Sequence, residues 1–77
     1  MDINYMKEFV VLAEIGNFLE AADHLYLSQS SLSRHIKSIE EELGTTLFDR
    51  TTRKVRLNEY GKAFLPYAKQ ISQIQYE

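Results

Sequence analysis

The chain has 77 residues, of which 44% are hydrophobic and 26% charged, a composition that fits one small globular domain and excludes a disordered chain. It contains no cysteine, which excludes disulfides and thiolate metal sites, and its apolar runs are too short to span a bilayer. The net charge is −2, but four cations, Arg50, Arg53, Lys54 and Arg56, lie close together near the C-terminal third. We therefore expect a soluble, cytoplasmic protein with one basic edge.

Two amphipathic helices are predicted before residue 26. The first, over about residues 3 to 15, is indicated by apolar residues at helical spacing, namely Met6, Phe9, Val10 and Ala13. Gly16 can adopt the left-handed conformation that ends a helix, and Asn17 is a good cap for the next one. That second, short helix has one apolar stripe, formed by Phe18, Ala21, Ala22 and Leu25.

A third helix is predicted over residues 28 to 43. Ser28 is a natural N-cap, and Gly44 is placed to end the helix. Four apolar residues fall on one face: Leu32, Ile36, Ile39 and Leu43. Two helices joined by a short turn, with the apolar positions facing inward, are typical of a helix-turn-helix, and the first helix would complete its core.

The outward face of the third helix carries groups that suit DNA. At about 100° per residue, Ser30, Arg34 and Lys37 point away from the buried face, while Gln29 lies in the first turn. Gln and Arg can bind base edges in the major groove, and Ser can bind bases or phosphates. The last turn carries three carboxylates, Glu40 to Glu42, which phosphate would repel. We therefore expect the helix to enter the groove with its N-terminus first and its acidic end directed away from DNA.

The segment after Gly44 changes to a pattern typical of strands. Residues 45 to 58 predict two short strands, joined near residues 51 to 53, that form a β-wing over residues 48 to 57. We expect four apolar residues to anchor the wing to the helices: Leu47, Phe48, Val55 and Leu57. The basic side chains of the wing would then contact flanking phosphates or enter a minor groove; these are Arg50, Arg53, Lys54 and Arg56.

A final helix is predicted from residue 58 to the end of the chain. Asn58 is a suitable N-cap, and Gly61 suggests close packing against a neighbouring element. Apolar and aromatic residues recur at intervals of four and three, as in a coiled coil, and we expect them to form a dimerisation seam: Tyr60, Phe64, Tyr67, Ile71 and Ile74. Because the pattern runs to the last residues without a stop signal, we expect the sequence to be a truncated part of a longer chain.

Catalysis and metal binding are disfavoured. Ser31 and His35 are four residues apart on a helix, but no carboxylate is evidently placed to orient the imidazole. Glu20 and His24 share the same spacing, which is weak support for a metal site when no cysteine is present. We expect no enzymatic activity, no metal site and no cofactor.

Several stretches in register resemble the N-terminal domain of LysR-type transcriptional regulators. They are SQSSLSRHIKSIE at residues 28–40, ELGTTLFDR at 42–50 and RKVRL at 53–57, together with Ala21, Ala22 and Gly61. The resemblance implies a mainly α-helical winged helix-turn-helix over residues 1–57, with a three-helix core and a two-stranded wing. It implies that residues 58–77 form a long linker helix that pairs two subunits. It also implies a C-terminal domain, absent from this sequence, that binds a small-molecule effector.

The resemblance also assigns residues to roles at the DNA. By position, the major-groove readers would be Gln29, Ser30, Ser33 and Arg34. The residues near phosphate would be Ser28, Ser31, His35 and Lys37. Arg53, with Arg50 and Lys54, would serve the wing.

Taken together, the residues and the resemblance predict sequence-specific binding of double-stranded DNA by a bacterial regulator. The partner would be a partly palindromic operator bound by a homodimer, and a tetramer of the full-length protein stays open. Two alternatives remain. One is another winged-helix regulator, such as the molybdate-responsive type, and the other is a winged-helix module that uses its basic wing on an acidic protein partner.

Overall fold

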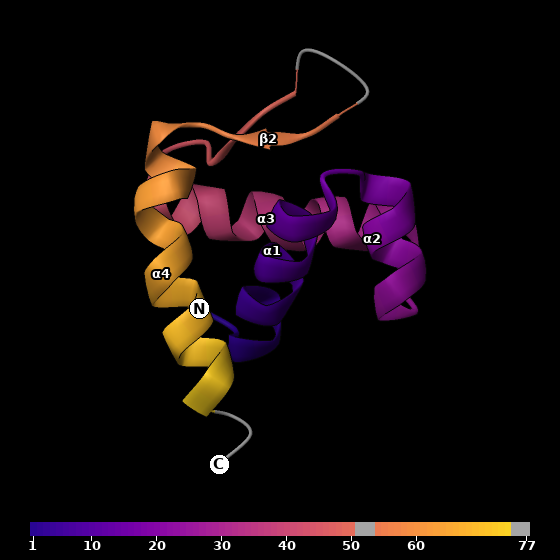
Figure 1. The fold of residues 1–77 in the computed structure, drawn as a ribbon, viewed down its shortest axis with the longest axis horizontal. Helices are drawn as coiled ribbons and strands as arrows, with labels where there is room; N and C mark the ends of the chain where they lie inside the picture. The colour runs from indigo at the N-terminus through magenta and orange to yellow at the C-terminus, as the bar shows by residue number, and fades with distance from the viewer. Residues whose placement is uncertain (51–53, 75–77) are drawn as a thin grey trace.

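Helices dominate the chain in the computed structural model, which describes residues 1–50 and 54–74 (Figure 1). Within these residues, the helices are α1 (Ile3–Ile15), α2 (Phe18–Leu25), α3 (Gln29–Leu43) and α4 (Glu59–Ile74), and the strands are β1 (Phe48–Asp49) and β2 (Arg56–Leu57). In the view of Figure 1, α4 and α2 stand on either side of α1 and α3, and the strands lie along the top. The predicted three-helix core with a two-stranded wing and a further helix is confirmed.

The helix ends lie where the sequence predicts them. The side chain of Asn17 accepts a hydrogen bond from the Glu20 N–H at 3.0 Å, and that of Ser28 accepts one from the Ser31 N–H at 3.1 Å. Gly16 and Gly44 have φ values of 75° and 74°, the left-handed conformation that glycine adopts without a steric penalty. The boundaries at Gly16 and Asn17, at Ser28 and at Gly44 therefore follow from local sequence signals.

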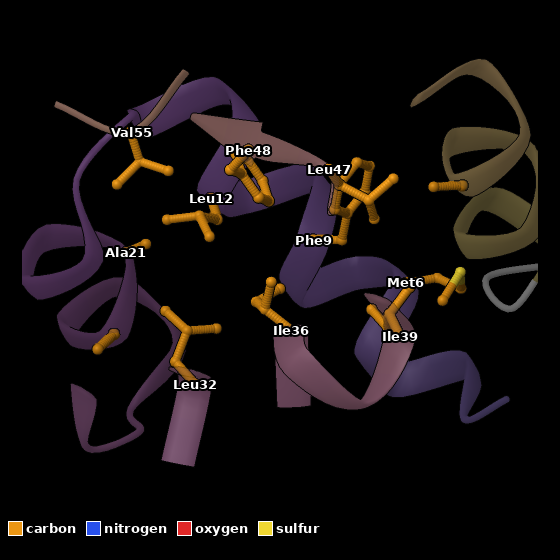
Figure 2. Close-up of a cluster of buried hydrophobic side chains, with 12 residues drawn as sticks. Met6, Phe9, Leu12, Ala21, Leu32, Ile36, Ile39, Leu47, Phe48 and Val55 are labelled. Carbon is orange, nitrogen blue, oxygen red and sulfur yellow. The ribbon is translucent and has the colours of Figure 1, made fainter. Parts of the chain in front are cut away.

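The hydrophobic core is built from all three N-terminal helices, the wing and α4 (Figure 2). Phe9 is fully buried, and its ring lies 5.4 Å from that of Phe48 and 5.3 Å from that of Phe64. The other large, fully buried side chains are Met6, Leu12, Leu32, Ile36, Ile39 and Leu47. One prediction is wrong: Leu43 is 40% exposed, because α3 extends past the end of the core.

The wing is held to the core by backbone hydrogen bonds as well as by apolar contacts. β1 and β2 are antiparallel, with Phe48 opposite Leu57. The N–H of Val55 donates to the carbonyl of Gly16 at 2.9 Å, so the second side of the wing is tied to the turn between α1 and α2. The four predicted anchors are confirmed, since Leu47, Phe48 and Val55 are buried and Leu57 packs against them. The predicted turn near residues 51 to 53 lies outside the described residues.

Helix α4 begins as part of the core. The side chain of Asn58 accepts the Gly61 N–H at 2.8 Å, which confirms the predicted cap. A Cβ on Gly61 would collide with the backbone carbonyl of Leu47, so glycine lets the helix start directly against the wing. The helix continues through Pro66 and buries Ala68 completely. The predicted division between residues 57 and 58 stays a prediction, but the first half of α4 packs with the preceding domain.

No helix within the described ranges, 1–50 and 54–74, has the length and apolar character needed to cross a membrane.

Candidate nucleic-acid interface

The predicted base-reading residues lie together at the front of α3. Gln29, Ser30 and Arg34 are exposed, and Ser33 is half-buried on the side of α3 that faces the wing. Gln29 and Ser33 line a hollow of about 440 Å³ with Arg50 of the wing and the first residues of α2. The start of α2, the front of α3 and the wing therefore border one surface that presents hydrogen-bond donors.

A chain of hydroxyl contacts orders this front end. The hydroxyl of Ser28 donates to Ser31 Oγ at 2.9 Å, and the Oγ atoms of Ser28 and Ser30 are 3.2 Å apart. Arg34 donates from Nη2 to Ser31 Oγ at 3.1 Å. These contacts hold the guanidinium of Arg34 beside the helix and leave its other N–H groups available to a ligand.

Glu40 differs from the other two carboxylates at the acidic end of α3, because it is buried and bonded. Its side chain is only 9% exposed. Oε2 accepts the N–H of Leu47 at 2.7 Å, and Oε1 accepts a hydrogen bond from Arg50 Nη2 at 3.0 Å. Glu40 therefore fastens the wing to α3, whereas Glu41 is exposed and Glu42 lies 3.4 Å from the Met1 ammonium.

Arg50 has a structural role that the sequence does not reveal. Besides its contact with Glu40, its guanidinium carbon lies 5.4 Å from the centroid of the Phe18 ring, in a cation–π arrangement. The side chain is still 39% exposed. Arg50 therefore joins α2, α3 and the end of β1. Its contact with DNA stays a prediction.

His35 lies on the flank of α3 that faces α1, away from the wing. Its Nδ1 is 2.6 Å from Oε1 of Glu8, and its ring stacks on Tyr5 with centroids 4.2 Å apart and an interplanar angle of 12°. The expectation that no carboxylate orients this imidazole is therefore wrong. Glu8 and His35 are 27 positions apart, and only the packing of α1 on α3 brings them together.

The basic edge of the wing extends onto α4. Lys54 and Arg56 are exposed and, with Lys62, line a hollow of about 590 Å³ beside the turn between α1 and α2. Glu20 is the carboxylate on the same hollow. Sequence reasoning missed Lys62, because it belongs to a different predicted element from the wing. Arg53, the remaining predicted wing cation, lies outside the described residues.

The predicted seam on α4 is divided between the surface and the core. Tyr60 and Tyr67 are 64% and 63% exposed, and Ile71 is 37% exposed. Phe64 instead packs against Phe9, so it belongs to the edge of the core. The exposed Leu43 joins both tyrosines around an apolar hollow of about 270 Å³. The side chain of Ile74 lies outside the described residues.

Comparisons with known proteins identify the family. Residues 3–62 match the model of the family described as bacterial regulatory helix-turn-helix proteins, lysR family. An HTH-type transcriptional regulator of Bacillus subtilis, YxjO, is 44% identical over 71 residues, which cover 92% of this chain and 24% of that protein. The chain thus spans about a quarter of the length of this relative.

Solved structures agree with the sequence comparison. The BenM DNA-binding domain in complex with benA site 1 DNA superposes with a TM-score of 0.90 at 38% identity, covering 99% of this chain and 90% of that one. The CbnR DNA-binding domain in its DNA complex gives a TM-score of 0.91 at 35% identity, covering 97% and 86%. The resemblance drawn from the sequence motifs is confirmed, and the chain belongs to the lysR family of bacterial helix-turn-helix regulators.

Proposed function

We propose that this chain is the sequence-specific DNA-binding part of a transcriptional regulator. The observation that carries the proposal is the surface formed by Gln29, Ser30, Ser33 and Arg34 at the exposed front of α3. Support also comes from the two similar domains, BenM and CbnR, whose structures are DNA complexes. In this proposal, α3 enters the major groove and these four residues read base edges.

The charges along α3 favour one orientation in the groove. The front carries hydroxyls and Arg34, while the last turn carries the exposed carboxylates of Glu41 and Glu42. Phosphates would repel those carboxylates, so the helix enters with its N-terminus first. Ser28, Ser31 and Lys37 then lie near the phosphates that border the groove.

The wing supplies the flanking contacts in this proposal. Arg53, Lys54 and Arg56 neutralise phosphates beside the major-groove site or enter the adjacent minor groove. Arg50 contributes through the part of its guanidinium that Glu40 does not occupy. The support is the exposure of Lys54 and Arg56 on the same wing that Glu40 fastens to α3.

We propose further that residues 58–77 act as a linker helix that joins two subunits. Tyr60, Tyr67 and Ile71 expose a row of large apolar groups along α4, and Leu43 extends that row onto α3. A two-fold dimer would match a partly palindromic operator. In a full-length protein of the size of the relatives, the remaining length would hold the effector-binding domain.

Salt-dependent binding to duplex DNA tests the proposal. A duplex is first selected from random sequences with the full chain, and its affinity is then measured by fluorescence anisotropy over a range of salt concentrations. We expect log K to fall linearly with log salt, with a slope of about −0.9 per phosphate neutralised. Equal, weak affinity for selected and random duplexes would contradict sequence-specific binding. Failure to bind any duplex, with salt-sensitive binding to an acidic protein, would favour the protein-interaction alternative.

A further inference from the structure

Two polar contacts hold α3 on opposite flanks of its buried face. At about 100° per residue, Glu40 lies about 80° to one side of the buried Leu32 and His35 about 60° to the other. Glu40 binds the wing through Leu47 N–H and Arg50. His35 contacts α1 through Glu8 and Tyr5. Apolar contacts keep α3 on the core, and these two ties limit its rotation about its own axis in either direction.

The contact of His35 with α1 has a specific geometry. The carboxylate of Glu8 holds one ring edge of His35 at 2.6 Å, and the ring of Tyr5 covers one face at a centroid distance of 4.2 Å. The side chains of His35 and Glu8 are only 22% and 11% exposed, so water has limited access to replace the bond. An edge bond and a face stack together restrict both side-chain torsions of the imidazole.

We propose that Glu8 and Tyr5 act through His35 as positioning residues that fix the rotation of α3, so that Arg34 and its neighbours meet the base edges in register. This inference rests on the proposed function. An Arg side chain that reaches about 8 Å from the helix axis moves about 1.4 Å when the helix turns by 10°. Hydrogen bonds tolerate a range of only about 0.5 Å in donor–acceptor distance. A small rotation of α3 is therefore enough to break a bidentate contact with a base.

This role differs from the phosphate contact that the resemblance implies for His35. Glu8 occupies Nδ1, Tyr5 covers a ring face, and the side chain lies on the flank that faces α1 rather than the wing. Replacing a positioning residue should lower the affinity for the selected duplex more than the affinity for random duplexes. Replacing a phosphate contact should lower both affinities alike and make the salt slope less steep.

The test compares variants of the full chain on two probes, the duplex selected with the unmodified chain and a random duplex of equal length. We expect His35→Ala and Glu8→Ala each to lower the ratio of the two affinities about tenfold, the size of one lost base contact, with an unchanged salt slope on random DNA. The double variant should be no worse than either single one. His35→Asn, whose side-chain amide lies at the position of Nδ1 and can donate to Glu8, should recover most of the ratio. His24→Ala, at an exposed histidine of α2, serves as the matched control and should change neither quantity.

The outcomes separate the explanations. Equal loss on both probes, with the slope reduced by about one, would make His35 a phosphate contact and overturn the inference. A second contrary outcome is that the variants melt at a lower temperature while the ratio of their affinities for selected and random duplex, measured where each variant is folded, is unchanged. Tyr5, Glu8 and His35 would then have a purely structural role, and the inference would be overturned. If the unmodified chain shows no salt-dependent duplex binding, the proposed function fails, and this inference fails with it.

Discussion

Replacing Glu40 with Gln should weaken the attachment of the wing to α3 and lower the stability of the domain by a predictable amount. The carboxylate accepts one backbone N–H, from Leu47, and one guanidinium N–H, from Arg50. An amide has a single acceptor oxygen, so its NH₂ group would face one of these two donors. If the oxygen stays with Leu47, the contact is retained in a weaker, uncharged form and the contact with Arg50 is lost. Because Arg50 is 39% exposed, solvent screening limits that second loss to about 1 kcal/mol or less.

The two losses together should lower the free energy of unfolding by about 2 kcal/mol, since a hydrogen bond to a charged group contributes about 1.5–3 kcal/mol. In a chain of this size that corresponds to a melting temperature lower by about 8–16 °C. Urea and thermal unfolding followed by circular dichroism measure both quantities. Glu41→Gln removes the same charge from an exposed neighbour and should stay within about 0.5 kcal/mol of the unmodified chain. Equal stability of the two variants would refute the role assigned to Glu40.

Three further changes probe packing, the wing and the proposed dimer. Gly61→Ala should lower the free energy of unfolding by about 3 kcal/mol, because the new Cβ meets the rigid backbone carbonyl that precedes β1. In the control variant Gly44→Ala the new Cβ meets open space, so the cost should be only about 1 kcal/mol, for the positive φ alone. Equal losses of the two variants in urea unfolding would contradict this expectation. Replacing Arg53 and Lys54 with Ala should flatten the salt slope of DNA binding by up to about two, and an unchanged slope would remove the wing from the interface. Ile71→Glu should shift dimers toward monomers in sedimentation velocity, because a charge would enter the proposed seam. An unaltered mass distribution would contradict a dimer contact at this part of α4.

Local signals were sufficient to predict the elements of this fold. Ser28 and Asn58 cap helices through their own side chains, and Gly44 ends one through its own backbone conformation. Such signals act within a few residues, so they can be read without knowing the tertiary structure. The outward position of Arg34 likewise follows from helix periodicity alone.

Contacts between distant segments could not be predicted in the same way. Glu8 and His35 are 27 positions apart, and neither residue type indicates its partner. Glu40 resembled a surface carboxylate because it stands in a run of three, although it lies inside the structure between α3 and the wing. Leu43 fits the apolar period of α3 but lies beyond the end of the core. Periodicity predicts which face of a helix is buried, but it does not predict how far along the helix the core extends. The surroundings of these four residues depend on how the elements pack, which the pattern within one element does not determine.

The most direct test of base reading by α3 is the effect of Arg34→Ala on sequence preference. Affinities of the variant and of the unmodified chain are measured on the selected duplex and on random duplex, with Lys69→Ala, an exposed cation of α4, as the charge-matched control. Base reading predicts a loss of about 1–3 kcal/mol on the selected duplex, a smaller loss on random DNA and a relaxed preference at one position. Equal losses on both duplexes would show that Arg34 contributes charge only, which would contradict base reading at the front of α3.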